Sequence, residues 1–219
     1  MEETRSRLDR GGAATRTKIL DAATRMVAEK GVAGLRIRAV AHEAGIREGS
    51  LYNHFAGRAD IIRAIFRRAD ASMSPFGVVL DVETSPSEHV DAARDFIRSR
   101  GLDAFLEGAT GQIIARFRSD PLLFRFLRAV SGARSHDEDA RAAYDGFFLG
   151  EMRRVFRSAV SLAAESGRLK PGAPAEGVAD LLVAAFEHAL GSTRGDGDLA
   201  AFGAELGRLV QSVAALCRP

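Results

Sequence analysis

The chain has 219 residues, of which 46% are apolar and 27% are charged, enough for one hydrophobic core and a smaller second one. Its 31 Lys and Arg residues nearly balance its 29 Asp and Glu residues, but residues 1–68 hold 14 basic and 8 acidic side chains, against 17 and 21 in the remainder. This asymmetry indicates an anionic partner for the N-terminal part alone.

Composition also excludes several classes of protein. The single cysteine, Cys217, excludes a disulfide framework and a cysteine-based zinc site. The charged start MEETRSRLDR lacks the apolar stretch of a signal peptide, and no run approaches the roughly 18–20 apolar residues of a membrane span. We therefore expect a cytoplasmic protein that binds no metal or cofactor.

The first part of the chain carries a helical pattern of apolar residues. Residues 1–14 are polar and contain a Gly-Gly pair, which predicts a disordered tail. Apolar positions at helical spacing then predict helices over 15–30, 37–44, 50–55 and 61–69. Residues 74–86, with two prolines, predict an irregular connection and a domain boundary.

The later helices are marked by start signals. They are Ser85-Pro86, Asp120-Pro121, the capping box Ser135–Glu138, Pro174 and Asp198, with ends near Gly167, Gly191 and Leu216. No segment alternates with period two, so the fold class is all-α, with about nine or ten helices. The expected domains are residues 15–68 and a second, helical domain over residues 69–219.

Residues 37–55 have the pattern of a helix-turn-helix. Ala41 and Ala44 allow two helices to pack closely, Gly45 permits a positive φ at the turn, and Ile46 and Leu51 fill the wedge between the helices. The outer faces then carry short polar residues, which suit a helix that enters a DNA major groove.

The same stretch resembles the DNA-binding domain of the tetracycline-repressor family of bacterial transcription regulators. The resemblance rests on Gly49-Ser50-Leu51-Tyr52-Asn53-His54-Phe55 followed by Arg58, Asp60 and Ile61, on Ala41–Ile46 before it, and on Ala22, Ala23 and Gly31. It covers residues 15–66, whereas the later residues resemble the family only in architecture. The family implies a homodimer that represses transcription and that leaves its DNA operator when a small hydrophobic or amphipathic effector binds.

The resemblance also implies a set of DNA-contacting residues, some at the bases and some at the phosphates. They are Arg36, Arg38, Arg47, Glu48, Gly49, Ser50, Tyr52, Asn53, His54 and Arg58. Two positions depart from the family pattern. Leu35-Arg36 stand where a capping Thr or Ser is usual, and Glu48 stands where a basic residue is more common. Glu48 either accepts a hydrogen bond from a cytosine or lowers non-specific affinity by repelling phosphate.

Apolar residues of the later helices supply two further predictions. The resemblance places an effector cavity among residues 88–160, for which the candidates are Phe96, Phe105, Phe117, Phe126, Tyr144 and Phe148. It also favours a dimer interface made by the last two helices, for which the candidates are Ala179, Leu182, Phe186, Leu190, Phe202, Leu206, Leu209 and Val213. In both sets the alternative is ordinary packing inside one subunit.

Three other patterns have simpler explanations. Asp137, Glu138 and Asp139, which follow His136, suit the start of a helix without any metal. Gly195–Ala200 fits a dinucleotide-binding pattern but follows no strand, so we interpret it as a loop. Arg5, Arg7 and Arg10 suit a minor-groove arm, although equal acidic charge favours a plain tail. The alternatives to an effector-controlled repressor are a DNA-bound accessory factor without effector and an α-helical enzyme or carrier, for which no polar site is evident.

Overall fold

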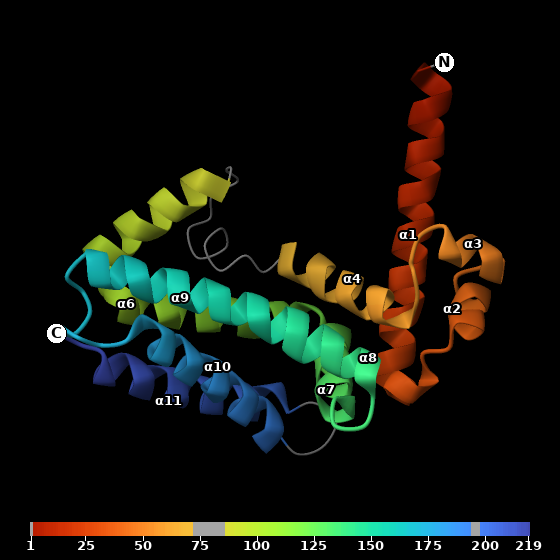
Figure 1. The fold of residues 1–219 in the computed structure, drawn as a ribbon. Helices are drawn as coiled ribbons and strands as arrows, with labels where there is room; N and C mark the ends of the chain where they lie inside the picture. Colours follow the sequence, from red (N-terminus) through yellow and green to blue (C-terminus); the bar gives the residue numbers. More distant parts are fainter. Residues whose placement is uncertain (1, 72–85, 194–197) are drawn as a thin grey trace. The chain divides into compact units, whose positions relative to one another are not determined.

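The computed structural model describes residues 2–71, 86–193 and 198–219, with side chains over 11–69, 91–193 and 198–219. These residues are helical and contain no β-strand, which confirms the all-α fold class (Figure 1). Residues 74–85 of the expected connection and residues 195–197 of the expected loop lie outside the described ranges.

The chain forms two compact units. The first contains Met1–Ala69 and Leu122–Phe148, and the second contains Asp70–Pro121 and Leu149–Pro219. This division differs from the expected domains 15–68 and 69–219, because residues 122–148 pack with the N-terminal helices. The sequence gives no local sign of this exchange, since it depends on contacts between residues far apart in the chain.

The first unit begins with a helix-turn-helix domain. Its elements are α1 (Glu2–Lys30), a short 3-10 helix (Val32–Gly34), α2 (Ile37–Glu43), α3 (Glu48–Tyr52) and α4 (Arg58–Ala71), followed later in the chain by α7 (Pro121–Ala133), α8 (Glu138–Arg141) and a π-helix (Ala142–Phe148). Ile19, Ala23 and Val27 of α1 are fully buried, as their helical spacing predicts.

The sequence predicts a disordered tail over residues 1–14, whereas the structure describes residues 2–14 as helical. Residues 2–14 continue α1 without a break, and the side-chain hydroxyl of Thr15 donates a 2.9 Å hydrogen bond to the Gly11 carbonyl. The segment contains no proline, so its Gly-Gly pair lowers helix propensity without removing a backbone donor.

Phe66 of α4 explains why residues 122–148 belong to the first unit. Its ring lies 5.3 Å from that of Phe126 on α7, and 4.9 Å from that of Phe148 on the π-helix, on which it stacks. Tyr144 completes the cluster at 6.4 Å from Phe66. Aromatic pairs at these separations add to the energy of apolar burial, so α4 is bound to α7 and the π-helix by a shared core.

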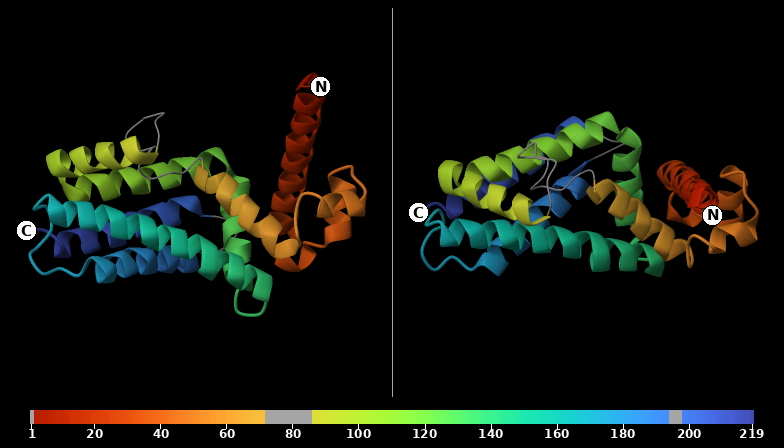
Figure 2. Two further views of the ribbon diagram at one scale, coloured as in Figure 1. Left: turned by 45° about the horizontal axis from the view of Figure 1, so that its top comes forward. Right: turned by 90° about the horizontal axis from the view of Figure 1, so that it is seen from above.

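The second unit is a four-helix bundle. Its helices are α6 (Pro86–Ser119), α9 (Leu149–Glu165), α10 (Ala175–Ser192) and α11 (Leu199–Leu216). Each helix contacts two others, in the closed order α6, α9, α10, α11, and the left view of Figure 2 shows α9, α10 and α11 running side by side. Gly101, with φ +89°, divides α6 into two helical halves. This left-handed backbone conformation is unfavourable for residues with a side chain, so glycine suits the position.

Several helix ends agree with the sequence. α7 begins at Pro121, α11 begins after Asp198, whose carboxylate accepts a 2.9 Å hydrogen bond from the Ala201 N–H, and Gly167 has a positive φ after α9. The predicted cap at Ser135 is displaced, because Asp137 accepts the hydrogen bond from Ala140 N–H at the start of α8.

Helix α11 is more apolar than the sequence analysis predicts. Among the described residues it is the one helix long and apolar enough to cross a membrane by length and composition, a test that core helices of soluble proteins also pass. Its buried stripe, Phe202, Leu206 and Val210, lies where α11 contacts α6 and α10, as in an amphipathic bundle helix.

Candidate DNA-binding surface

Helices α2 and α3 form the helix-turn-helix that the sequence predicts. Val40 and Leu51 are fully buried between them, and Gly45 adopts φ +70° in the turn. The Ile46 N–H donates a 2.9 Å hydrogen bond to the Ala41 carbonyl, which closes the turn after α2. Small residues and a left-handed glycine therefore hold the two helices at short separation.

The residues expected to contact DNA divide by exposure. Arg36, Arg38, Arg47, Glu48, Gly49, Tyr52 and Asn53 are exposed, whereas Ser50, His54 and Arg58 are half-buried. The side chain of Tyr52 is the clearest case, because 54% of its surface is exposed although it follows the fully buried Leu51. An exposed tyrosine presents both its ring and its hydroxyl to a partner.

The start of α2 lacks a side-chain cap. Arg36 occupies the N-cap position and makes no capping hydrogen bond, as the departure from the family pattern predicts. Leu35, one residue earlier, is buried at 2% exposure and anchors the entry to α2. The guanidinium of Arg36 therefore makes no capping contact at this end of α2.

The acidic residues of the first unit neutralise some of its arginines but not those at α2 and α3. Ion pairs join Arg25 to Glu43 at 3.1 Å and Arg68 to Asp21 at 2.6 Å. Within the described side chains, no carboxylate lies within ion-pair distance of Arg36, Arg38 or Arg47. The positive charge that the sequence places in residues 1–68 therefore remains available on this face.

Arg58 is not available to bind DNA in the same way, because it is paired with acids of its own unit. Its Nε lies 2.7 Å from a carboxylate oxygen of Asp139, and its terminal nitrogen Nη2 lies 2.9 Å from a carboxylate oxygen of Asp137. Burial alone would lower the pKa of Arg58, but the hydrogen bond to Asp139 and the charges of both carboxylates hold this pKa above its ordinary value. The sequence predicts a phosphate contact here, whereas in the structure the guanidinium is held by two acids from the corner between α7 and α8.

The six candidates for effector binding fall into two groups. Phe126, Tyr144 and Phe148 lie together around Phe66 in the first unit. Phe96, Phe105 and Phe117 belong to the second unit, where the ring of Phe117 lies 6.0 Å from that of Phe202. Phe96 and Phe148 are half-buried and the other four are buried. The aromatic rings thus form packed cores in both units.

The candidates for the dimer interface are mostly covered by their own chain. Ala179, Leu182, Phe186, Leu190, Phe202, Leu206 and Val213 are buried within the second unit, and Leu209 is half-buried. The ring of Phe186 lies 5.6 Å from that of Phe202, so α10 and α11 pack on each other through these stripes. Periodicity finds the apolar stripe of a helix correctly but does not tell which partner covers it.

A different face of α10 is exposed. Leu181 is 52% exposed, and Gly177, Ala184, His188 and Gly191 share its side of the helix at spacings of three and four residues. Helix α11 likewise has exposed small or apolar residues, among them Ala200, Ala204 and Leu216. Small residues beside an exposed leucine allow another helix to approach closely.

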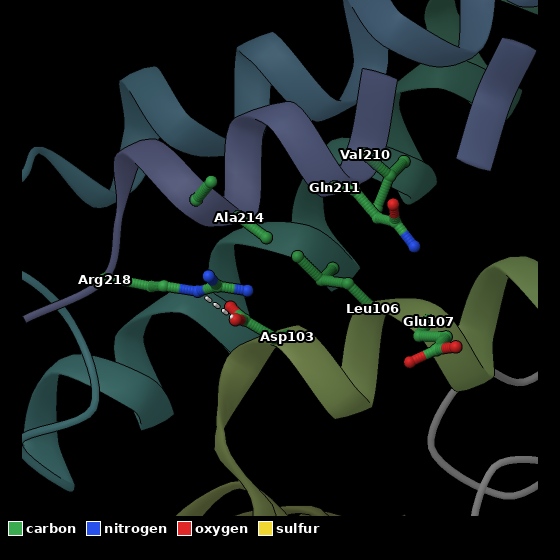
Figure 3. A pocket seen from close by; sticks show the side chains of 8 residues that line it. Asp103, Leu106, Glu107, Val210, Gln211, Ala214 and Arg218 are labelled. Atoms are coloured by element: carbon green, nitrogen blue, oxygen red, sulfur yellow. Dashed lines mark hydrogen bonds and ion pairs between the residues drawn. The ribbon is translucent and has the colours of Figure 1, made fainter. Parts of the chain in front are cut away.

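A hollow of about 370 Å³ lies between α6 and α11 (Figure 3). Leu106, Val210 and Ala214 line it, and an ion pair between Arg218 and Asp103 closes one end at 2.5 Å. It contains none of the predicted effector residues. Glu107 also lines the hollow, so its lining carries two acidic side chains against the one arginine.

Comparison with known proteins assigns the chain to a protein family. A family model described as "Bacterial regulatory proteins, tetR family" matches residues 19–65, and one described as "Tetracyclin repressor-like, C-terminal domain" matches residues 102–213, about half of the chain. The chain belongs to the tetracycline-repressor family. Members of this family are DNA-binding transcription regulators, so the helix-turn-helix is its DNA-binding element.

Relatives agree with this assignment. The transcriptional repressor KstR2 of Mycolicibacterium smegmatis is 34% identical over 77 residues, which are 35% of this chain and 38% of that protein. This alignment thus spans little more than a third of the relative. A putative family member from Syntrophomonas wolfei has a TM-score of 0.70 at 13% identity, covering 92% of this chain and 95% of the other.

A second solved structure shares the fold. SmeT, the repressor of the multidrug efflux pump SmeDEF in Stenotrophomonas maltophilia, has a TM-score of 0.63 at 18% identity, over 93% of this chain and 90% of the other. At such identities the two solved structures show the fold alone.

Proposed function

We propose that this chain is a transcriptional repressor that binds a pseudo-palindromic operator as a homodimer in the bacterial cytoplasm and leaves it when a small molecule binds the helical domain. The observation that carries the proposal is the exposed, unneutralised positive face at α2 and α3. Arg36, Arg38 and Arg47 lie on it with Tyr52 and Asn53, while neighbouring acids pair with other arginines.

Each group on this face has a role in the proposal. The arginines attract the phosphates, which supplies affinity without sequence information. Asn53 and Ser50 present polar groups that can hydrogen-bond base edges in the major groove. Tyr52 and His54 hold phosphates through their hydroxyl and ring N–H, and Gly49 lets the backbone come close to the DNA.

A two-fold symmetric dimer binds two inverted half-sites, so its operator is expected to be pseudo-palindromic. The exposed stripe at Leu181 and Ala184 on α10, together with exposed alanines and Leu216 on α11, supports a symmetric helical interface. In this proposal the buried stripes predicted from the sequence stabilise each subunit, and their outer neighbours meet the partner.

Effector control is supported by similarity and by composition. SmeT, a fold neighbour with 20% identity in this comparison, has been solved in complex with triclosan. Here the aromatic cluster around Phe66 joins α4 to α7 and the π-helix. A ligand that parts these rings would shift α4 and the reading helices with it, so binding at one site would change affinity at the other.

DNA binding by variants of the recognition helix, α3, and of its C-cap tests the proposal. An operator would be selected from random duplexes, and Asn53→Ala and Tyr52→Ala would be compared with Ala164→Ser, a change at an exposed position on α9. We expect both variants to bind the operator about 5- to 150-fold more weakly, about 1–3 kcal/mol, while Ala164→Ser binds normally. Unchanged affinity of both α3 variants would refute the assignment.

An accessory DNA-binding factor without effector is the second candidate. The complete burial of Phe105, Phe126 and Tyr144 favours it, because packed rings leave their ligand-facing surfaces covered. Screening small molecules for a rise in melting temperature separates the two, since a ligand that binds only the folded state stabilises it.

A further inference from the structure

A basic hollow lies beside the helix-turn-helix, lined by residues of α1 and α2. It measures about 770 Å³ and is lined by Lys30, Arg36, Arg38 and His42, with Met26 and Ala39 as its apolar part. Lys30 ends α1, and the other three polar residues come from the start and outer face of α2. Two of the four, Lys30 and His42, belong to no predicted site.

The charge in this hollow is unbalanced. Glu43 is the one acid on its lining, and its carboxylate is paired with Arg25 at 3.1 Å. Within the described side chains, no carboxylate lies within ion-pair distance of Lys30, Arg36 or Arg38. Three permanent cations therefore share one open hollow with a histidine and without a neutralising anion, which is a favourable site for an anion in solution.

We propose that this hollow takes a phosphate of the operator backbone beyond the major groove read by α3, with Lys30 as its principal contact and His42 as a second. The proposal rests on the proposed function, because it assumes that Arg36 and Arg38 lie against DNA. Lys30 and His42 line the same hollow as these arginines, so all four side chains can act on the same stretch of backbone. Duplex DNA supplies phosphates at a regular short spacing along its axis, which suits a row of cations better than a single site does.

The contact carries no sequence information. A lysine ammonium is a point charge that attracts any phosphate, so Lys30 raises affinity for all sequences alike. Each phosphate neutralised adds about 0.9 to the magnitude of the slope of log K against log salt. The salt dependence of affinity therefore reports this phosphate contact independently of the residues at α3 that contact bases.

The experiment measures that slope with matched variants. Lys30→Gln removes the proposed contact, and Lys170→Gln removes one of the three lysines of the chain from the second unit, far from α2 in sequence. Binding of a random-sequence duplex and of the selected operator is followed by fluorescence anisotropy over a salt series. We expect Lys30→Gln to lower the slope magnitude by about 1 on both duplexes and Lys170→Gln to leave it unchanged.

A second variant adds a charge in place of removing one. His42→Lys should raise the slope magnitude by about 1, because a permanent cation joins the hollow. Wild-type slopes for both Lys30→Gln and His42→Lys would overturn the inference. If the chain selects no operator at all, the proposed function fails, whereas a selected operator that loses affinity with Asn53→Ala but shows wild-type slopes refutes the hollow alone.

Discussion

Arg58 and Asp139 join the first turn of α4 to the start of α8, with 2.7 Å between the guanidinium Nε and a carboxylate oxygen. Asp137 adds a second carboxylate at 2.9 Å and also caps α8 through the Ala140 N–H. The arginine therefore fixes the N-terminal end of α4 at the same segment whose aromatic rings hold Phe66 near the C-terminal end. Helix α4 is attached at both ends within the first unit.

Replacing Arg58 tests this attachment of α4. Arg58→Gln should lower the free energy of unfolding by about 1.5–3 kcal/mol, because charge-assisted hydrogen bonds are lost and two neighbouring carboxylates remain unpaired. Arg25→Gln is the matched control, since it breaks the more exposed pair with Glu43 and should cost no more than about 1 kcal/mol. Denaturant unfolding measures both changes. Equal costs would contradict the role of Arg58 in fixing α4.

Two adjacent residues of α3 should separate stability from DNA binding. Leu51 is fully buried and Tyr52 is 54% exposed. Leu51→Ala should destabilise the protein by about 2–5 kcal/mol, whereas Tyr52→Ala should change stability by no more than about 0.5 kcal/mol. Thermal melts and operator binding are measured together. A Tyr52→Ala protein that melts several degrees lower would show that the tyrosine serves packing.

Glu48 is an exposed acid on the positive face and lies in the first turn of α3. Glu48→Gln should raise affinity for random-sequence duplexes, because a charge that repels phosphate is removed. Selection with the same variant then decides between the two interpretations of Glu48. Loss of preference at one base pair identifies a cytosine reader, and an unchanged motif identifies a residue that limits non-specific binding. Lower affinity for random duplexes would contradict both.

The exposed stripe on α10 predicts a dimer contact. Leu181→Arg should convert the dimer to monomer, because it places a charge in an apolar interface. Ala164→Arg introduces the same side chain at an exposed position of α9 and should leave the dimer intact. Light scattering after size-exclusion chromatography measures the mass. A dimeric Leu181→Arg protein would exclude this face.

The single thiol should be slow to react. Cys217 is buried at 6% exposure, and burial, together with the nearby charge of Asp103, raises the pKa of its thiol. A raised pKa keeps the group protonated at neutral pH, and the thiolate is the reactive form. Alkylation of the folded protein by iodoacetamide at pH 7.5 should therefore be much slower than alkylation in denaturant. Similar rates would show that the C-terminal turn opens readily.

The sequence predicts the local features well because they depend on neighbouring residues. Gly45 adopts the positive φ expected at the turn, Asp198 caps α11, and the cap missing at Arg36 is missing in the structure. Each of these follows from the chemistry of one or two residues in a known position relative to a helix.

Long-range partners are beyond such reasoning. Arg58 meets acids 79 and 81 residues away, and no spacing rule connects them. Its positive charge is equally suited to a phosphate and to a carboxylate, so only the fold decides between them. The same holds for Phe186 and Leu206, whose stripes suit a partner subunit as well as the neighbouring helix of the same chain that covers them.

The central claim is that two exposed copies of α3 read a two-fold DNA sequence. Selection of binding sites from a random duplex library by the full chain, followed by sequencing, tests it most directly. The account predicts enrichment of one motif with two inverted half-sites about one helical turn apart or a multiple of it, lost when Asn53→Ala replaces the wild type. No enriched motif, or an asymmetric motif that Asn53→Ala selects equally well, would contradict it.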